Sequence, residues 1–224
     1  MCGLFGFVAK QGRNVDLDRL ATIATATEQR GRDAFGLVWT TTAGGLGTYK
    51  RPGAATDGLD DLLMVDGATI IAGHCRWATH GCPSNNRNNH PHAAGRGYLV
   101  HNGTVQNHEA LAKKYRLARE TECDTEVLAR LVNRTAGTIL QRTAWAAEQA
   151  VGKLAVLGVW ANPGRMILVR NGNPLYFGQN EDGFYFGSFP VAIPGAKLLR
   201  NAHACQLRLE AAEIEIQSLD LQAA

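Results

Sequence analysis

The amino-acid sequence predicts an α+β fold in which antiparallel β-sheets pack against layers of helices. Apolar segments of strand length lie at both ends of the chain, and most segments with helical spacing lie between them. A chain of 224 residues can bury a substantial hydrophobic core. Neither a linker composition nor a second core is apparent, so we expect one domain that spans residues 1–224.

The chain opens with a strand, a helix and a second strand. The run "LFGFVA" at residues 4–9 predicts a short buried strand. Apolar side chains then recur at helical spacing, at Leu17, Leu20, Ile23 and Ala24. Asn14 or Asp16 can cap the start of this helix, and Gly31 is suited to its end. The run "FGLVWT" at 35–40 predicts the second strand.

The middle of the chain contains both strands and helices. Glycine-rich residues 42–58 indicate turns around a short strand, and 58–65 can form a short helix. Strands are expected at 69–77 and 98–103, each ending in polar residues. Residues 123–137 have apolar side chains at 127, 128, 131 and 132, the spacing of an amphipathic helix, and 138–150 continues helical.

Beyond residue 152 the sequence changes to short apolar segments separated by turn residues. The turns are NPG, NGN and NEDG. The expected strands lie at 153–161, 165–171, 174–179, 183–188, 197–200, 204–210 and 213–218. We expect these strands to form an antiparallel meander.

Composition and charge exclude several classes of protein. The net charge is only +3 and no run of Lys and Arg is present, so we expect no nucleic-acid partner. No stretch approaches the roughly 20 apolar residues of a membrane helix. The five cysteines are an odd number without a secretory signal, which indicates free thiols in a reducing compartment. We therefore expect a cytoplasmic protein that does not contact membranes.

Polar motifs follow several of the apolar strands. They are "QRGRDAFG" at 29–36, "GHCRWATHGCPSNNRNNHPH" at 73–92, "VHNGTVQNH" at 100–108 and "TECDTEV" at 121–127. Together with "MCGLFG" at the start, they resemble the glutaminase domain of class II glutamine amidotransferases, which are N-terminal nucleophile hydrolases. The set is most similar to the glutamine-hydrolysing half of glucosamine-6-phosphate synthase. Five motifs in the family's order, over nearly the whole chain, make this resemblance specific.

The resemblance implies a fold and a reaction. The fold is a four-layer αββα sandwich with antiparallel sheets, as in N-terminal nucleophile hydrolases. The reaction is hydrolysis of the glutamine side-chain amide to glutamate and ammonia through a cysteine thioester, with no cofactor. Family members usually join this domain to a synthase or ligase domain. Since none is seen in this chain, we expect a separate subunit to accept the ammonia.

Cys2 is the candidate nucleophile. Taken alone, this position favours a core thiol in the first strand, and only the other motifs reverse that preference. A thiol at neutral pH is only a few per cent thiolate, so a base would help. Removal of Met1 would free the α-amine of Cys2, whose reference pKa of about 7.7–8 lies close to that of a thiol. The amine could then accept the thiol proton, directly or through a water, which explains why no separate catalytic histidine is needed.

The "HNG" motif is the candidate oxyanion site. The Asn102 side-chain amide and the Gly103 N–H could donate to a tetrahedral oxyanion, and glycine allows close approach of the backbone. Asn-Gly is also a strong hairpin signal. The two interpretations are compatible, because a tight turn would aim the donors.

Glutamine is a zwitterion, which calls for a cation and an anion in its site. Arg76 resembles the family's carboxylate-binding arginine, and Asp124 resembles the partner of the ammonium group. The alternatives are a surface salt bridge for Arg76 and a helix N-cap for Asp124. By the same resemblance, Thr79 and His80 line the substrate pocket, and Trp77 belongs to a mobile loop over it.

The resemblance assigns Arg30 and Asp33 a supporting role, as a structural ion pair near the N-terminus. Some residues depart from the family's pattern. Phe35 stands where the nearest relatives have a small residue, Cys75 stands where Thr is usual, and Cys82 is an additional thiol. These departures concern the detail of the pocket.

Two other functions compete with this one. The first is a zinc-binding interaction module, because potential ligands crowd one segment: His74, Cys75, His80, Cys82, His90 and His92. Their spacing fits no common zinc pattern, so we expect no metal. The second is an N-terminal-cysteine amidohydrolase that acts on another amide. Arg76 and Asp124 favour an amino-acid substrate.

Overall fold

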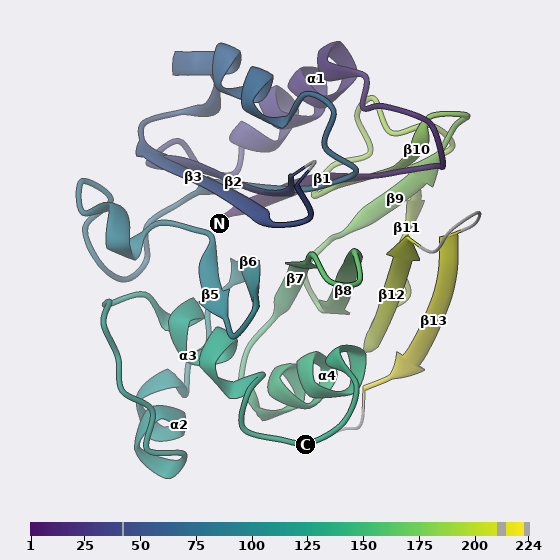
Figure 1. Ribbon diagram of the computed structural model, residues 1–224. Coiled ribbons are helices and arrows are strands. Elements are labelled where there is room, and N and C mark those ends of the chain that lie inside the picture. Colours follow the sequence, from purple (N-terminus) through teal and green to yellow (C-terminus); the bar gives the residue numbers. More distant parts are fainter. Residues whose placement is uncertain (42, 210–213, 222–224) are drawn as a thin grey trace.

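Two antiparallel β-sheets lie face to face, with helices on the outer face of each, in a computed structural model that describes residues 1–41, 43–209 and 214–221 (Figure 1). This arrangement confirms the four-layer αββα sandwich. Among the described residues, no helix combines the length and hydrophobicity that crossing a bilayer requires.

The first sheet has the strand order β11-β9-β10-β1-β4-β2-β3. Its strands are β1 (Gly3–Ala9), β2 (Ala34–Thr40), β3 (Leu46–Pro52), β4 (Ile70–Arg76), β9 (Tyr176–Gln179), β10 (Gly183–Gly187) and β11 (Lys197–Leu198). The second sheet has the order β13-β12-β8-β7-β6-β5. Its strands are β5 (His92–Ala94), β6 (Gly97–Gly103), β7 (Leu154–Trp160), β8 (Arg165–Asn171), β12 (His203–Leu209) and β13 (Ile214–Asp220).

Helices cover both outer faces (Figure 1). Over the first sheet lie α1 (Leu17–Glu28) and the 3-10 segment η1 (Ala55–Val65), which is kinked at Gly58. Below the second sheet lie α2 (His108–Lys114), α3 (Asp124–Leu131) and α4 (Ile139–Gln149). A short 3-10 turn, η2 (Asn86–Asn88), lies in the long loop between β4 and β5.

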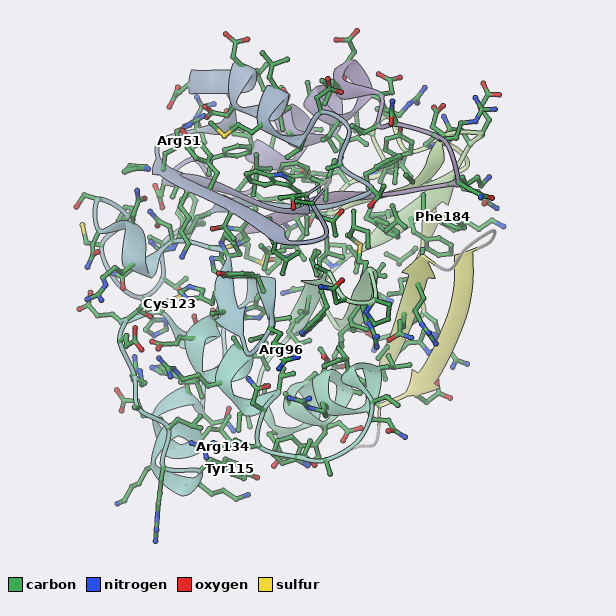
Figure 2. All side chains as sticks on the ribbon, viewed as in Figure 1. Arg51, Arg96, Tyr115, Cys123, Arg134 and Phe184 are labelled. Atoms are coloured by element: carbon green, nitrogen blue, oxygen red, sulfur yellow. The ribbon has the colours of Figure 1, made fainter. Side chains whose placement is uncertain are left out.

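The strand pleat separates three hydrophobic cores. On β1, Leu4 faces the space between the sheets, whereas the next residue, Phe5, faces the core under α1, because successive side chains point to opposite faces. Phe184 of β10 also belongs to the core between the sheets (Figure 2). The third core lies between the second sheet and α2–α4. Because four layers enclose three cores, each sheet has a core on both of its faces. Most strands are therefore apolar on both faces.

The predicted meander is wrong. After residue 152 the chain forms β7 and β8 in the second sheet, β9 to β11 in the first, and β12 and β13 in the second again. Alternating apolar residues indicate a strand but do not specify which of two stacked sheets it joins. Three expected segments, 42–58, 204–210 and 213–218, each include one residue outside the described part of the chain: 42, 210 and 213.

The helices differ from prediction in three ways. The segment 123–150 is two helices, α3 and α4, and not one continuous helical stretch; Thr138 caps the second. Helix α2 was not predicted. Asp16 caps α1 as expected, since its carboxylate accepts a hydrogen bond from the Arg19 N–H at 3.0 Å. Gly31 has another role, described below.

Candidate active site

Cys2 and the HNG motif meet at one end of the space between the two sheets. Leu4 of β1 and Val100 of β6 both face that space, so the pleat directs Cys2 and Asn102, two residues along each chain, to the same side. A cavity of about 620 Å³ opens beside them, and both Cys2 and Gly103 line it. The structure thus brings together the predicted nucleophile and the predicted oxyanion site.

The Cys2 thiol is buried and bound to backbone groups. Its side chain donates to the Trp77 carbonyl at 3.3 Å and accepts from the Trp77 N–H at 3.4 Å. Burial raises the pKa of the Cys2 thiol, and the Trp77 N–H, the charged N-terminus and Arg76 only partly oppose this. With Met1 in place the sulfur is therefore protonated at neutral pH, and it needs a base to act as a nucleophile.

Gly31 brings the end of α1 against the backbone that holds the thiol. A Cβ at Gly31 would lie 2.3 Å from the Arg76 carbonyl carbon and 2.4 Å from the Trp77 nitrogen, so only glycine fits. Helix α1 itself ends earlier, with Gln29 as its C-cap. The prediction that Gly31 ends the helix is therefore wrong, and close packing explains this glycine.

Arg30 and Asp33 flank this glycine and bind separate backbone groups. Arg30 Nε donates to the Cys2 carbonyl at 2.8 Å, and the Asp33 carboxylate accepts from the Ala78 N–H at 2.7 Å. Asp33 N–H also donates to the Arg76 carbonyl at 2.9 Å. Arg30 therefore holds the backbone at Cys2, and Asp33 holds the backbone at Ala78. The prediction that Arg30 and Asp33 form an ion pair with each other is wrong.

Asn102 is completely buried, yet neither its Nδ2 nor its Oδ1 has a hydrogen-bond partner among the described residues. A buried amide without partners is costly, and such groups are found where a ligand completes them. Gly103 has φ +148°, and a Cβ there would lie 2.2 Å from the Lys153 carbonyl oxygen. The hairpin interpretation is wrong, because β6 pairs with β7 some fifty residues later and leads into α2.

Arg76, at the end of β4, lies under the loop that follows it. Its guanidinium donates to Asn89 Oδ1 at 2.8 Å, to the Gly81 carbonyl at 3.1 Å and to the His80 carbonyl. Arg76 is only 2% exposed, which excludes a surface salt bridge. In this structure it anchors both ends of the loop; carboxylate binding stays a prediction.

Asp124 is the first residue of α3 and does not cap it. Cys123 occupies the N-cap position, and the Asp124 carboxylate accepts a hydrogen bond from the Val105 N–H at 2.6 Å. The N-cap alternative is therefore wrong. This bond joins α3 to the chain just after Gly103. Asp124 and Arg76 are both close enough to Cys2 to influence the thiol pKa, in opposite directions.

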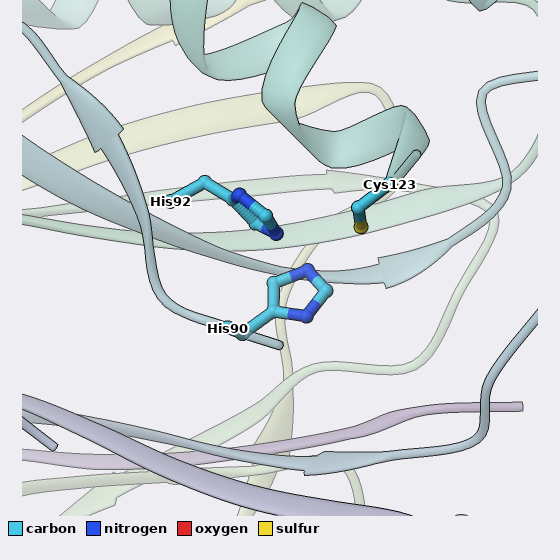
Figure 3. Close-up of side chains that lie close together, drawn as sticks. All are labelled: His90, His92 and Cys123. Carbon is cyan, nitrogen blue, oxygen red and sulfur yellow. The ribbon is translucent and has the colours of Figure 1, made fainter. Parts of the chain in front are cut away.

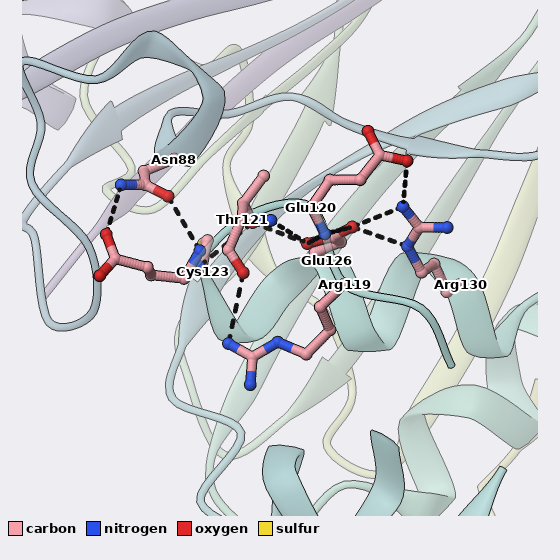
Figure 4. A network of polar contacts seen from close by, with 8 residues as sticks. Asn88, Arg119, Glu120, Thr121, Cys123, Glu126 and Arg130 are labelled. Atoms are coloured by element: carbon pink, nitrogen blue, oxygen red, sulfur yellow. Dashed lines mark hydrogen bonds and ion pairs between the residues drawn. The ribbon is translucent and has the colours of Figure 1, made fainter. Parts of the chain in front are cut away.

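A polar network holds the segment before α3 in place (Figure 4). The Glu126 carboxylate accepts from the N–H groups of Glu120 and Thr121, at 2.9 Å and 2.8 Å, and from Arg130 Nε at 2.7 Å. Burial works to raise the pKa of Glu126, but these hydrogen bonds lower it overall. The ionised carboxylate therefore fixes the start of α3, and with it Asp124.

The remaining predicted pocket residues lie on the loop after β4. Trp77 and Thr79 line the cavity, and Trp77 is 56% exposed. His80 lies half-buried against the His108 ring, with centroids 4.9 Å apart, and its Nδ1 is 3.3 Å from the Thr79 hydroxyl. Two of the three side chains are thus at the cavity, and His80 is beside it.

Three of the histidines behind the site belong to one buried cluster. The His74 and His90 rings stack with centroids 3.7 Å apart, and His92 lies edge-on to His90. Ligand atoms of His90, His92 and Cys123 lie within 4.8 Å of one another (Figure 3). Tetrahedral zinc would bring such atoms to roughly 3.3–3.8 Å. His90 Nε2 is 2.9 Å from the Thr125 hydroxyl, whereas His90 Nδ1 and His92 Nε2 have no hydrogen-bond partner among the described residues.

The other potential ligands of the zinc-module alternative lie apart from this cluster. Cys75 Sγ donates to the Ala24 carbonyl at 3.8 Å under α1, and Cys82 is exposed on the loop, 3.0 Å from the Ser84 hydroxyl. Burial raises the pKa of Cys123 to about 12, so in the metal-free protein its thiol is protonated. The sequence cluster is therefore not one site in space.

Sequence reasoning missed two residues at the site. Asn173, in the loop after β8, lines the cavity and donates to the Asn102 carbonyl at 2.8 Å. The Ser188 hydroxyl accepts from the Leu4 N–H at 2.9 Å and so fixes the start of β1. Asn173 follows β8 and Ser188 follows β10, and the polar residues at the ends of these strands were the only sign of them in the sequence.

Known proteins resemble this chain over most of its length. A family model described as a glutamine amidotransferase domain matches residues 74–194. The isomerizing glutamine--fructose-6-phosphate aminotransferase of Gluconobacter oxydans is 36% identical over 205 residues, which cover 86% of this chain and 32% of that protein. That of Vibrio vulnificus is 34% identical over 202 residues, with the same coverage. This chain thus spans about a third of the length of these relatives.

Solved structures share the fold. Glutamine phosphoribosylpyrophosphate amidotransferase from B. subtilis matches with a TM-score of 0.79 and 24% identity, over 99% of this chain and 49% of that one. A glutamine aminotransferase class-II domain protein from Silicibacter pomeroyi matches with a TM-score of 0.67 and 17% identity, over 99% and 100%. The four-layer sandwich is therefore the N-terminal nucleophile hydrolase-like fold that the motifs implied.

Sequence and fold agree on the relationship. The family model covers more than half of the chain, and relatives with 34–36% identity cover 86% of it. The resemblance drawn from five short motifs is thereby confirmed, and the chain belongs to the class II glutamine amidotransferase family.

Proposed function

We propose that this domain hydrolyses the side-chain amide of glutamine to glutamate and ammonia, with Cys2 as the nucleophile. One observation carries the proposal: the buried Cys2 thiol lines a cavity together with Gly103, and the residue before Gly103, Asn102, has a fully buried side-chain amide with no partner among the described residues. The free amide suits an oxygen that becomes charged only during the reaction.

Catalysis requires the loss of Met1. The freed α-amine of Cys2 accepts the Sγ proton, and the sulfur attacks the side-chain carbonyl carbon of glutamine. An α-amine has a reference pKa of about 7.7–8, so a fraction of it is unprotonated and available as a base near neutral pH. The oxyanion of the tetrahedral intermediate accepts from Asn102 Nδ2 and the Gly103 N–H.

Collapse of the intermediate breaks the C–N bond. The protonated amine gives its proton to the leaving nitrogen, which departs as ammonia and leaves a γ-glutamyl thioester on Cys2. Water, deprotonated by the same amine, then attacks the thioester and releases glutamate and the thiol. Arg76 and Asp124 are proposed to bind the α-carboxylate and α-ammonium groups, which orient the amide over Cys2.

Mass spectrometry and active-site labelling test the mechanism. The active protein should have lost one methionine, and a glutamine analogue with an electrophilic side-chain carbonyl should label Cys2. Cys2→Ala should abolish glutamate release, whereas Cys82→Ser, which removes an exposed thiol on the nearby loop, should not. Full activity in protein that keeps Met1, or labelling of Cys82 or Cys123, would contradict the proposal.

We further infer that a synthase on a partner subunit receives the ammonia. An exposed apolar rim around the cavity supports this inference: Trp77 is 56% exposed and Val151 is 54% exposed, and both line the cavity. A partner that covers this rim would close the route from Cys2 and keep ammonia from becoming ammonium in solvent.

The rate of glutamate release tests the partnership. The isolated domain should hydrolyse glutamine slowly, and a synthase loaded with its acceptor should accelerate it. Trp77→Ser and Val151→Ser together should weaken that acceleration. Leu63→Ser should not, because Leu63 is an exposed apolar residue on η1 that does not line the cavity. Full turnover by the isolated chain, independent of any acceptor, would instead indicate an independent glutaminase.

A further inference from the structure

We propose that Asn173 is a positioning residue that aims the Gly103 N–H at the oxyanion. This inference rests on the proposed glutamine hydrolysis. Asn173 lies in the loop between β8 and β9, is 6% exposed and lines the cavity beside Cys2. It therefore reaches the reaction site from a segment of the chain that none of the five motifs includes.

The Asn173 amide binds the peptide unit that carries the oxyanion donor. Its Nδ2 donates to the Asn102 carbonyl at 2.8 Å and to the Lys153 carbonyl at 3.1 Å. Both partners are acceptors only, so the amide nitrogen must be the atom that faces them. The Asn102 carbonyl and the Gly103 N–H belong to one planar trans peptide and point in opposite directions. Fixing the carbonyl therefore fixes the direction of the N–H.

The packing around Gly103 shows why this peptide needs to be held. The Gly103 backbone approaches so closely that a Cβ would lie 2.2 Å from the Lys153 oxygen. One amide nitrogen thus serves two carbonyl oxygens that lie near each other, and without it their dipoles would repel. The β6–β7 register pairs Asn102 with Ala155 and Gly103 with Leu154, whereas β5 pairs only with residues 97–99 of β6, so the other edge of the strand has no β5 partner at Gly103.

The inference predicts a specific defect. Without Asn173 the peptide is held only by the end of the β6–β7 pairing, and the Gly103 N–H is aimed less accurately at the developing charge. Loss of one oxyanion donor reduces kcat by roughly 10²–10³ in a known case, so a misdirected donor should cost about tenfold or more. Binding of glutamine and the reactivity of the thiol itself depend on other groups and should change little.

Steady-state kinetics and two Cys2 reagents test this in the mature domain. In Asn173→Ala and Asn173→Ser, kcat should fall about tenfold or more while KM changes little. The affinity for glutamate γ-semialdehyde, whose adduct with Cys2 carries the oxyanion, should fall in parallel with kcat/KM. Alkylation of Cys2 by iodoacetamide forms no oxyanion and should keep its rate. Asn173→Gln, which retains an amide donor, should recover part of the activity.

Asn201→Ala is the matched control. Asn201 Oδ1 accepts from the Gly172 N–H at 2.7 Å, so it anchors the same loop without touching the Asn102 carbonyl. Its loss should leave the semialdehyde affinity unchanged. Equal effects of the Asn173 and Asn201 variants, an iodoacetamide rate that falls as far as kcat, or an unchanged kcat in Asn173→Ala would overturn the inference. A mature wild-type domain that releases no glutamate would overturn the proposed function itself.

Discussion

Lowering the pH from 7.5 to 5 should destabilise this domain strongly through its buried histidines. His74, His90, His92 and His101 lie buried behind the active site. Burial lowers the pKa of each, and in His90 and His92 nearby positive groups add to the effect. The pKa of His92 falls to about 3, whereas the Asn88 backbone acts in the opposite direction.

The magnitude follows from proton linkage. A histidine has a pKa of about 6.5 when unfolded, so between that pH and about 3 the unfolded chain binds a proton that folded His92 does not. Stability is therefore complete above the unfolded pKa and is lost as the pH falls below it. At pH 5 the difference is about 2 kcal/mol for His92. His74 and His90 shift in the same direction, so they add to this loss.

Urea unfolding at pH 7.5 and pH 5, with a chelator present, measures this effect. His92→Gln should reduce the difference between the two pH values by about 2 kcal/mol, whatever it does to stability at pH 7.5. His80→Gln, which removes an imidazole from the loop after β4, controls for the loss of a histidine. A wild-type domain equally stable at both pH values, or a His92→Gln variant with the wild-type pH dependence, would refute the reasoning.

Two further predictions concern the start of α3 and the end of α1. Asp124→Asn keeps an acceptor for the Val105 N–H but loses the charge, so KM for glutamine should rise more than tenfold with little change in Tm. Glu126→Gln, the same change two residues further along α3, should lower Tm and raise KM much less, because Glu126 acts only through the position of Asp124. Gly31→Ala should lower Tm and also slow alkylation of Cys2, because the new methyl group displaces the Trp77 backbone; normal alkylation in a destabilised variant would contradict the second effect.

Local pattern accounts for most of the elements of this fold. The strand that follows Cys2, the cap at Asp16 and the strands 165–171 and 183–188 are found where apolar runs and turn residues predict them. What pattern does not specify is the partner of each strand. Both sheets are buried on both faces, so their strands have the same apolar character, and only long-range packing decides between them.

The site divides in a similar way. Motifs indicated Cys2, Asn102 and Gly103 as candidates, because the proposed chemistry requires those residue types. They did not predict what holds those residues. Asn173 follows a turn that the sequence marks only as a turn, and Gly31 is required by a backbone that arrives from β4, 45 residues further along the chain. Contacts between distant segments leave no local pattern, so they became visible only in the structure.

The free Asn102 amide implies that the site is maintained at the expense of stability, and Asn102→Leu tests this. Leucine has a similar branched shape without polar atoms, and an unsatisfied buried group costs about 1–3 kcal/mol. Asn102→Leu should therefore abolish glutamate release and raise Tm by about 2–4 °C for each kcal/mol recovered. Asn88 is equally buried, but its amide bonds Glu122 in both directions, at 3.0 Å and 3.1 Å. Asn88→Leu should lower Tm, and a fall in Tm in both variants would show that Asn102 is satisfied without a ligand.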